Sequence, residues 1–334
     1  MTGDATRMLD RRKVLKLGLA TGAAFLPASV RAQAYPNRPI TLIVAAPAGG
    51  TTDAGARVVA SIAEKLFGQP IVIVNKGGAG GQVGWTELAL AKPDAYTIGF
   101  VVLPGMNTQV LDPERAALFT ENSFVPIINQ VLDPGILWVK ADSPFNTFAD
   151  LVAAAQKSPG TIRASTTGLL SDDHLNILMT EEAAPGVRFR IVHLDGSAGQ
   201  LKETLGGNVD VSFDNVGGAL KPIKAGQARA LMVTDTVRSS FFPDVPTSVE
   251  LGFPTIISSS TRGIVAPKGT PSEALTILTN VFSQAMADPE HNKRLEAQAL
   301  TVKIMVGEEY VTYYRNAHEQ ARKYVASAKA RSSK

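Results

Sequence analysis

Apolar runs of strand length alternate with helix-like stretches along most of this chain. The run ITLIVAA at residues 40–46 has the length of a buried strand, and DAGARVVASIAEKLFG follows it with apolar residues at helical spacing as far as Gly68. The scheme repeats with PIVIVN as a strand, QVGWTELALAKP as a helix and YTIGFVVL as the next strand. Strand, helix and strand in this order predict an α/β fold with parallel pairing.

A second series of alternating elements begins with PGILWVK, after an irregular stretch that contains Pro104, Pro113 and Pro126. It ends near Ser260, where the strand RGIVAPKGT follows, and three helices are expected at residues 271–288, 290–299 and 308–329. This order predicts two lobes. Residues 35–139 begin lobe one, residues 140–260 form lobe two, and residues 261–334 return to lobe one. Ligands of such sheets lie beyond the carboxyl ends of the strands, so we expect one cleft between the lobes.

The first 34 residues have the pattern of an export signal. Arg11-Arg12-Lys13 precede an apolar stretch from Val14 to Val30, which is too short to span a bilayer, and cleavage is expected after Ala32 or Ala34. The string DRRKVLKLG is similar to the twin-arginine motif, although paired arginines also occur in ordinary signals. The chain has no cysteine, which excludes disulfides and a lipid anchor on cysteine. We expect an exported, soluble periplasmic protein.

The apparent basic charge belongs to this signal. The whole chain has a net charge of +3, but residues 1–34 hold six of the basic and two of the acidic side chains, which leaves the remainder at −1. A nearly neutral chain without a basic run interleaved with aromatic residues gives no reason to expect nucleic-acid binding.

The loop PAGGTTD at residues 47–53 joins the first strand to its helix. Gly49 allows a tight turn, and the N–H groups of Gly50, Thr51 and Thr52 can face an anion at the helix N-terminus. Asp53 is expected to cap the helix or to lie in its first turn. The alternative is a glycine turn and a capped helix with no ligand. The loop lacks the lysine of a nucleotide-binding P-loop, and GGAGGQVG has Val83 where a dinucleotide motif requires its last glycine.

Two loops of the second series have a matching form. STTGLLSDDH contains Thr166, Thr167 and Gly168, and LDGSAGQ contains Asp195, Gly196 and Ser197; each follows a strand and begins a helix. Three helix N-termini at one gap would hold carboxylate oxygens through N–H donors. For each loop by itself, a capped helix without a ligand is the alternative. Asp214, at the end of the strand VDVSFDNV, is a further candidate contact.

Catalytic and metal motifs are weak. Ser197 in DGSAG misses the nucleophile-elbow spacing by one residue, and the four histidines do not have the spacing of a metal site. The acids of DDH at residues 172–174 fit a helix start. We therefore expect no enzyme, no metal and no cofactor.

Several motifs together carry a family resemblance: YPNRPITLIVAAPAGGTTDAGAR, GQPIVIVNKGGAGGQVG, AKPDAYTIGF, GSAGQLKETLGGNVDVSFD, GQARALMVT and FFPDVPTSVELGFP. Their order and spacing resemble the substrate-binding proteins of tripartite tricarboxylate transporters, the Bug family. The resemblance implies a two-lobed type II periplasmic-binding-protein fold, in which each lobe is a mostly parallel sheet flanked by helices. It also implies that Gly49–Asp53, Thr166–Gly168 and Asp195–Ser197 hold a ligand carboxylate through backbone amides and water. The receptor would then deliver its ligand to a pair of membrane subunits, and we expect it to be a monomer.

The chain departs from the family pattern at three places. Leu194-Asp195-Gly196 stands where Tyr-Lys-Gly is usual, Thr261-Arg262-Gly263 where Trp-x-Gly is common, and Leu169-Leu170 where glycine is usual. One hypothesis is that Asp195 meets the far end of the ligand and disfavours a second carboxylate there, unless Arg262 intervenes; the alternative is that Asp195 only caps a helix. A receptor that presents its ligand to a membrane sensor is the alternative function.

Overall fold

The computed structural model describes residues 35–332, and residues 38–334 form a compact unit of their own. The export signal, its twin-arginine motif and both cleavage sites lie outside the described residues. The strands of this unit are β1 (Ile40–Val44), β2 (Ile71–Asn75), β3 (Thr97–Leu103), β4 (Phe124–Lys140), β5 (Arg163–Thr166), β6 (Arg190–His193), β7 (Val211–Asn215), β8 (Ala228–Thr234), β9 (Ser259–Pro267) and β10 (Val302–Val306).

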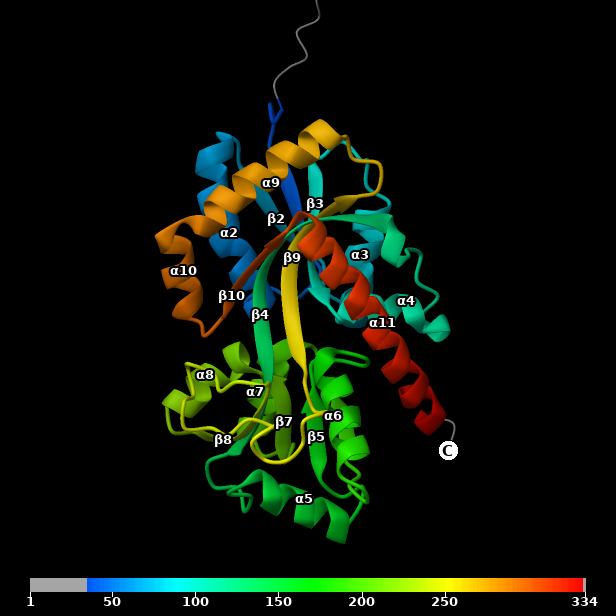
Figure 1. The fold of residues 1–334 in the computed structure, drawn as a ribbon, viewed down its shortest axis with the longest axis vertical. Helices are drawn as coiled ribbons and strands as arrows, with labels where there is room; N and C mark the ends of the chain where they lie inside the picture. The colour runs from blue at the N-terminus through cyan, green and yellow to red at the C-terminus, as the bar shows by residue number, and fades with distance from the viewer. Residues whose placement is uncertain (1–34, 333–334) are drawn as a thin grey trace, which may run out of the picture. The chain divides into compact units, whose positions relative to one another are not determined.

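The strands join in the order β2-β1-β3-β9-β4-β7-β5-β6, and β8 and β10 also pair with β4. Parallel pairs occur between β1 and β2, β1 and β3, β5 and β6, and β5 and β7. The long strand β4 pairs antiparallel with β9 and β10 along its first part and with β7 and β8 along its second part. We call β1, β2, β3, β9 and β10 the first strand group, and β5, β6, β7 and β8 the second strand group. Figure 1 shows β4 and β9 side by side between them.

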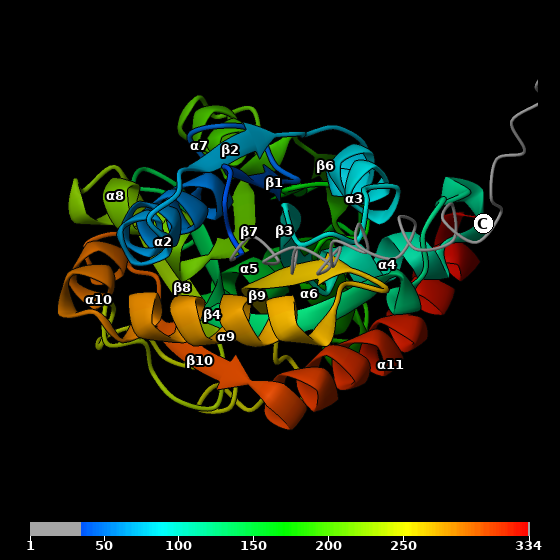
Figure 2. The same ribbon diagram turned by 90° about the horizontal axis from the view of Figure 1, so that it is seen from above.

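Helices cover the strands of each group. The helices are α2 (Thr51–Phe67), α3 (Gln82–Ala89), α4 (Gly105–Leu111), α5 (Phe148–Lys157), α6 (Asp172–Ala183), α7 (Gly196–Leu205), α8 (Val216–Lys224), α9 (Ser272–Ala287), α10 (Pro289–Glu296) and α11 (Gly307–Ser332). In Figure 2, α2 and α3 lie on opposite sides of β1. A central sheet flanked by helices confirms the predicted α/β class.

Separate apolar clusters support the two strand groups. One cluster packs Ile43, Trp85 and Phe124 with Tyr314 of α11, and another packs Leu137, Phe148 and Phe213 with Val325, also of α11. Burial of such side chains stabilises a fold by about 2 kcal/mol each. The C-terminal helix therefore contributes apolar side chains to the cores of both groups.

The sequence located most elements, and prolines account for two that it missed. Helix α2 ends at Gly68, whose φ of 65° is the left-handed conformation expected of a glycine helix end. The stretch expected to be irregular contains α4, which begins after Pro104, and the first part of β4. Pro126 fits within β4 because the pairing with β9 shifts register between Pro126 and Ile128.

The predicted lobe boundaries at residues 139–140 and 260–261 stay a prediction. Residues 139 and 140 lie at the end of β4, and residues 260 and 261 lie at the start of β9. Within residues 35–332, no helix combines the length and the apolar character that a membrane span requires.

Candidate functional site

A cavity of about 140 Å³ lies between the loops of the two strand groups. Its lining includes residues that follow the ends of β1, β2, β5 and β6, as expected for a site beyond the carboxyl ends of parallel strands. Its lining residues are Ala45, Ala46, Pro47, Ala48, Gly50, Thr51, Thr52, Gly78, Gly80, Gly81, Trp85, Val102, Gly105, Gln109, Thr167, Gly168, Leu169, Leu170, Ser171, Asp172, Asp195, Gly196, Ser197, Ala198, Asn215, Ser260 and Arg262.

The loop after β1 presents the start of α2 to the cavity. Gly50 is the N-cap residue and makes no side-chain cap, and Gly50, Thr51 and Thr52 all line the cavity. The first N–H groups of a helix lack partners within the helix and favour an anion. This end of the cavity therefore offers donors.

Asp53 holds this loop in place and is not among the lining residues. Its carboxylate accepts hydrogen bonds from Gly49 N at 2.9 Å, from Arg57 Nε at 3.0 Å and from Asn75 Nδ2 at 3.0 Å. Burial raises the pKa of Asp53, but the hydrogen bonds from Arg57, Gly49 and Asn75 outweigh it and hold the pKa below its ordinary value. Gly49 and Asp53 thus form a brace between α2 and β2.

The loop after β5 is held mainly by bonds to its own helix. Thr167 donates both its N–H, at 3.0 Å, and its hydroxyl, at 2.6 Å, to Asp173 Oδ2. The Ser171 hydroxyl caps α6 by accepting from His174 N. Thr166 bonds to Gly168 and to His193 Nδ1 and is not among the lining residues. Thr167 and Gly168 reach the cavity, but the Thr167 donors already have an acceptor.

The loop after β6 meets the first loop across the cavity. Asp195 is the N-cap residue of α7, yet its side chain makes no capping hydrogen bond, and it is exposed at the rim. A Cβ on Gly50 would lie 3.8 Å from Ser197 Oγ. The two helix starts therefore face the same small volume.

Eight of the twelve predicted contacts line the cavity, and Gly49, Asp53, Thr166 and Asp214 do not. Asp214 is buried, where it accepts from Trp138 Nε1 at 3.1 Å and from Asn215 N at 2.8 Å. Burial raises the pKa of Asp214 to about 7 against those two hydrogen bonds, and the charges of Asp133 and Asp172 raise it further.

The inner end of the cavity, which we call the floor, consists of Asp172, Asn215, Ser260 and Arg262. The Arg262 Nη1 donates to Asp133 Oδ2 at 3.0 Å, and its Nη2 donates to Thr51 Oγ1 at 3.3 Å. Asn215 Nδ2 donates to Asp172 Oδ2 at 2.8 Å. Burial raises the pKa of Asp172, while Asn215 and the charge of Arg262 oppose that rise. The floor is polar but not strongly positive.

Three buried lining side chains carry a polar atom without a hydrogen-bond partner: Trp85 Nε1, Gln109 Oε1 and Arg262 Nε. Buried polar atoms are rarely left unpaired. These three atoms have almost no accessible surface, so they lie behind the cavity wall although their side chains line it. A Cβ at Gly81 would lie 2.7 Å from the Trp85 ring, so glycine there gives Trp85 room to reach the cavity.

Sequence reasoning missed Trp85, Gln109, Asn215 and Ser260 as lining residues, and it named Arg262 only as a group that could intervene between Asp195 and a ligand carboxylate. The glycine-rich loop at residues 77–81 could have indicated a further part of the site, because it follows strand β2 in the same way that the first loop follows strand β1. Arg262 gave another signal, as a charged residue within an otherwise apolar strand.

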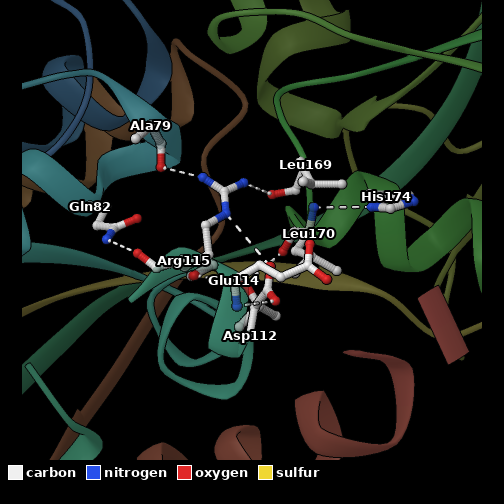
Figure 3. Close-up of polar contacts among 10 residues, drawn as sticks. Ala79, Gln82, Asp112, Glu114, Arg115, Leu169, Leu170 and His174 are labelled. Atoms are coloured by element: carbon white, nitrogen blue, oxygen red, sulfur yellow. Dashed lines mark hydrogen bonds and ion pairs between the residues drawn. The ribbon is translucent and has the colours of Figure 1, made fainter. Parts of the chain in front are cut away.

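Contacts between the strand groups fix the loop after β5 (Figure 3). Arg115 Nη1 donates to Ala79 O at 3.1 Å, and its Nη2 donates to Leu169 O at 3.4 Å. The buried Thr108 hydroxyl lies 2.7 Å from Leu170 O and 2.8 Å from Gly105 O of its own helix, so the two carbonyls share one donor. Residues between β3 and β4 thus hold two successive carbonyls of the opposite loop.

Chemically, this arrangement suits reversible binding of a small anion. Donors at the starts of α2 and α7 converge, apolar side chains such as Trp85 and Val102 line part of the wall, and the floor offers mixed polar groups. Among residues 35–332, no group of three or more His, Cys, Asp or Glu side chains could hold a metal ion.

Comparisons with known proteins agree with this geometry. The model of the tripartite tricarboxylate transporter family receptor matches residues 55–329. BugT of Bordetella pertussis is 30% identical over 303 residues, which cover 87% of this chain and 89% of BugT. The structure of the periplasmic binding protein BugD has a TM-score of 0.79 and 29% identity, with 88% of this chain and 98% of BugD covered. An R. palustris protein solved with adipate has a TM-score of 0.81 and 27% identity, with 87% and 98% covered.

The family model spans most of the chain, and the Bug relatives cover nearly all of it, which confirms the resemblance. Members of this family are solute-binding receptors and not enzymes. The chain belongs to the tripartite tricarboxylate transporter receptor family, the family of the Bug solute-binding proteins.

Proposed function

We propose that this protein is a periplasmic receptor that captures a small organic carboxylate and delivers it to the membrane subunits of a tripartite tricarboxylate-type transporter. The observation that carries the proposal is the convergence of the α2 and α7 starts, with Gly50 and Ser197 facing each other, on one cavity. Helix N-termini favour a carboxylate there. The adipate in a structural relative supports the same ligand class.

The carboxylate lies, in this proposal, against the N–H groups of Gly50, Thr51 and Thr52 and against Gly196 and Ser197. Thr167, Gly168 and Asp195 complete the wall. Gly49, Asp53 and Thr166 support these loops from behind, and Asp214 supports the floor through Asn215. The contacts are mostly main-chain donors, which suits release as well as capture.

The two strand groups act as lobes that close over the ligand, with β4 and β9 between them. Closure of two lobes about connecting strands is a common response to a ligand. Small-angle scattering of the purified protein should give a smaller radius of gyration with saturating ligand, and an unchanged radius would count against closure.

The ligand class is tested by a thermal-shift screen of the exported protein with mono-, di- and tricarboxylates, followed by calorimetry. Amines and sugars of similar size serve as controls. We expect at least one carboxylate to raise the melting temperature in a concentration-dependent way, since a ligand that binds only the folded state stabilises it. A protein that responds to no carboxylate contradicts the proposal.

The transport role and the location are tested in cells. Deletion of the genes for the transporter's membrane subunits should abolish uptake of the identified ligand. A ligand-dependent transcriptional response that survives this deletion would favour delivery to a sensor. Arg11→Lys combined with Arg12→Lys should retain the precursor in the cytoplasm if export uses the twin-arginine route. Unchanged export in a strain without that translocon would exclude the route.

A further inference from the structure

Four buried carboxyl groups lie at and behind the floor of the cavity. We call them the carboxyl cluster: Asp133, Asp172, Asp173 and Asp214, each at most 5% exposed. Asp133 pairs with Arg262 Nη1 at 3.0 Å. Asn215 joins this pair to Asp172, since its Nδ2 donates to Asp133 O at 3.2 Å and to Asp172 Oδ2 at 2.8 Å. The cluster therefore forms where β4, β7, β9 and the start of α6 meet.

These carboxyl groups outnumber the positive charge beside them. Arg262 is the only basic side chain among the described residues that line the cavity. Away from water, like charges repel strongly, so the charged forms of neighbouring carboxyls oppose one another. Burial, followed by the charges of Asp172 and Asp214, raises the pKa of Asp173. Burial raises the pKa of Asp214 to about 7, and the charges of Asp133 and Asp172 add to this rise. The cluster thus holds protons near neutral pH.

The cluster reaches the cavity through Asp172, which lines it together with Gly50 and Thr51. Arg262 Nη2 donates to Thr51 Oγ1 at 3.3 Å, and the charge of the same guanidinium opposes the rise in the pKa of Asp172. One side chain therefore lies close both to the start of α2 and to Asp172. A ligand carboxylate at the start of α2 would bring a further negative charge near the cluster, which favours the protonated form of a carboxyl group.

Other titratable or charged groups lie on the elements around Asp172. Burial raises the pKa of Tyr313 on α11, and the charge of Asp172 adds to this rise, which keeps the phenol neutral. Burial, with the charge of Arg115, lowers the pKa of His193, which keeps the imidazole neutral near pH 7. Because an imidazole titrates closest to neutral pH, His193 is the rival proton acceptor. The remaining groups are His174 on α6, Asp195 at the rim of the cavity and the Asp53–Arg57 pair at the start of α2.

We propose that the carboxyl cluster takes up a proton from solvent when the receptor binds its ligand anion, so that capture becomes tighter as the surroundings become more acidic. This regulation rests on the proposed function, because it requires an anion in the cavity. The bound anion favours protonation of the cluster, so the cluster binds protons more tightly in the complex than in the free receptor. By linkage, protons then favour the complex, and ligand affinity rises as the pH falls through the range in which the cluster titrates.

The test is isothermal titration calorimetry at pH 6.5, 7.5 and 8.5, in buffers with different heats of ionisation, with butyrate, benzoate and adipate as probes. Carboxylic acids have a pKa of about 4–5, so the probes are largely ionised over this range. We expect a probe that binds to do so about fivefold more tightly at pH 6.5 than at pH 8.5, which corresponds to an average uptake of about a third of a proton.

Two variants assign the proton to the cluster. Asp172→Asn keeps an acceptor for Asn215 and removes the cluster charge that lines the cavity. We expect its proton uptake to fall by about half or more, and its binding at pH 8.5 to be about threefold tighter than in the wild-type protein, whereas a merely structural role would weaken binding. Asp214→Asn, outside the cavity lining, should also lower the uptake. Asp244→Asn, at an exposed position outside the cavity, is the charge-matched control and should keep the wild-type uptake.

The outcomes separate the two proposals. If no probe binds, the carboxylate that binds most tightly in the thermal-shift screen takes their place, and a protein that binds no carboxylate contradicts the receptor itself. Binding without proton uptake, or with proton release, overturns the proton linkage alone, and this arm needs no variant to fold. The linkage to the cluster also fails if the uptake persists in full in Asp172→Asn and Asp214→Asn, or if it disappears in His193→Gln.

Discussion

The loops after β1 and after β5 have similar sequences, but their hydrogen-bond donors have different partners. Both run from a strand through glycine and threonine into a helix, and both reach the cavity. In the first loop, Asp53 takes the amide of Gly49 and leaves the start of α2 facing the cavity. In the second loop, Asp173 accepts hydrogen bonds from the N–H and the hydroxyl of Thr167. Thr108 donates to Leu170 O, and Arg115 donates to Leu169 O. The acid near each helix start accepts from a different part of its loop: Gly49 N, outside the cavity lining, in the first loop, and the N–H and hydroxyl of the lining residue Thr167 in the second.

The largest expected effect concerns the brace of the first loop. Asp53→Asn should lower the free energy of unfolding by about 3 kcal/mol at pH 7, because hydrogen bonds to an ionised group stabilise by roughly 1.5–3 kcal/mol each. The pKa of Asp53 is lowered in the fold, so its contribution is present above the unfolded pKa near 3.8 and is lost as the pH falls through the folded value. Urea unfolding at pH 7 and pH 3 should therefore show a smaller difference at pH 3. An equal difference at both values would contradict the ionic role.

The attachment of the second loop is tested by Thr108→Val, which keeps the shape of the side chain and removes its hydroxyl. Leu170 O and Gly105 O would lose the hydroxyl donor that they share, at a cost of about 2 kcal/mol in unfolding free energy. Thr276→Val removes a hydroxyl on the exposed face of α9 and should cost less than about 0.5 kcal/mol. Similar losses in both variants would show that the Leu170 contact has no special role.

The donor role of the first loop is tested by Gly50→Val. Gly50 has an extended backbone, φ −81° and ψ 173°, that valine also adopts, and the new side chain would point towards Ser197. We expect ligand affinity to fall by about tenfold, or 1.4 kcal/mol, with little change in melting temperature. Gly199→Ala, on α7 but outside the cavity, is the matched control and should bind normally.

The acids near the second loop should give a pH dependence opposite to that of Asp53. Burial raises the pKa of Asp214 to about 7, so the unfolded chain loses this proton at lower pH than the folded protein. The free energy of unfolding should then fall as the pH rises from about 4 to 7, with at most about 1.4 kcal/mol per pH unit from this group. Asp214→Asn should make the stability profile flatter over this range. A profile with the same slope in the variant would assign the dependence to other groups.

The smallest expected effect is that of Arg115→Ala. Arg115 is partly buried, and besides Ala79 O and Leu169 O it pairs with the buried Asp112 at 3.8 Å, so we expect a loss of about 1 kcal/mol in unfolding free energy. Hydrogen exchange at Leu169 and Leu170 should nevertheless become faster, since the loop loses one attachment. A loss as large as that of Thr108→Val would show that the two contacts contribute equally, against the expected ranking.

The sequence predicted single strands, turns and helices well, but it did not predict which distant segments pair or which distant residues meet in the cavity. The strand at residues 40–46, its glycine turn and the helix to Gly68 depend on neighbouring residues, and the structure has them. Strand β10 was missed because VKIMV is a short run between helices that becomes a strand only by pairing with β4. The floor was missed for the same reason: Asp172, Asn215 and Arg262 lie far apart in the sequence, and the pairing of β4 with β7 and β9 brings them together.

The second loop is attached through its main-chain carbonyls, and this has an evolutionary consequence. Thr108 and Arg115 contact oxygen atoms that every amino acid possesses, so these contacts do not depend on which side chains occupy positions 169 and 170. Leu170 has a φ of 62°, which narrows the residues tolerated there, but Leu169 has no such restriction and lines the cavity. Substitution at position 169 can therefore change the cavity wall while the loop keeps its contacts, which leaves this receptor a route to altered ligand preference by a single substitution.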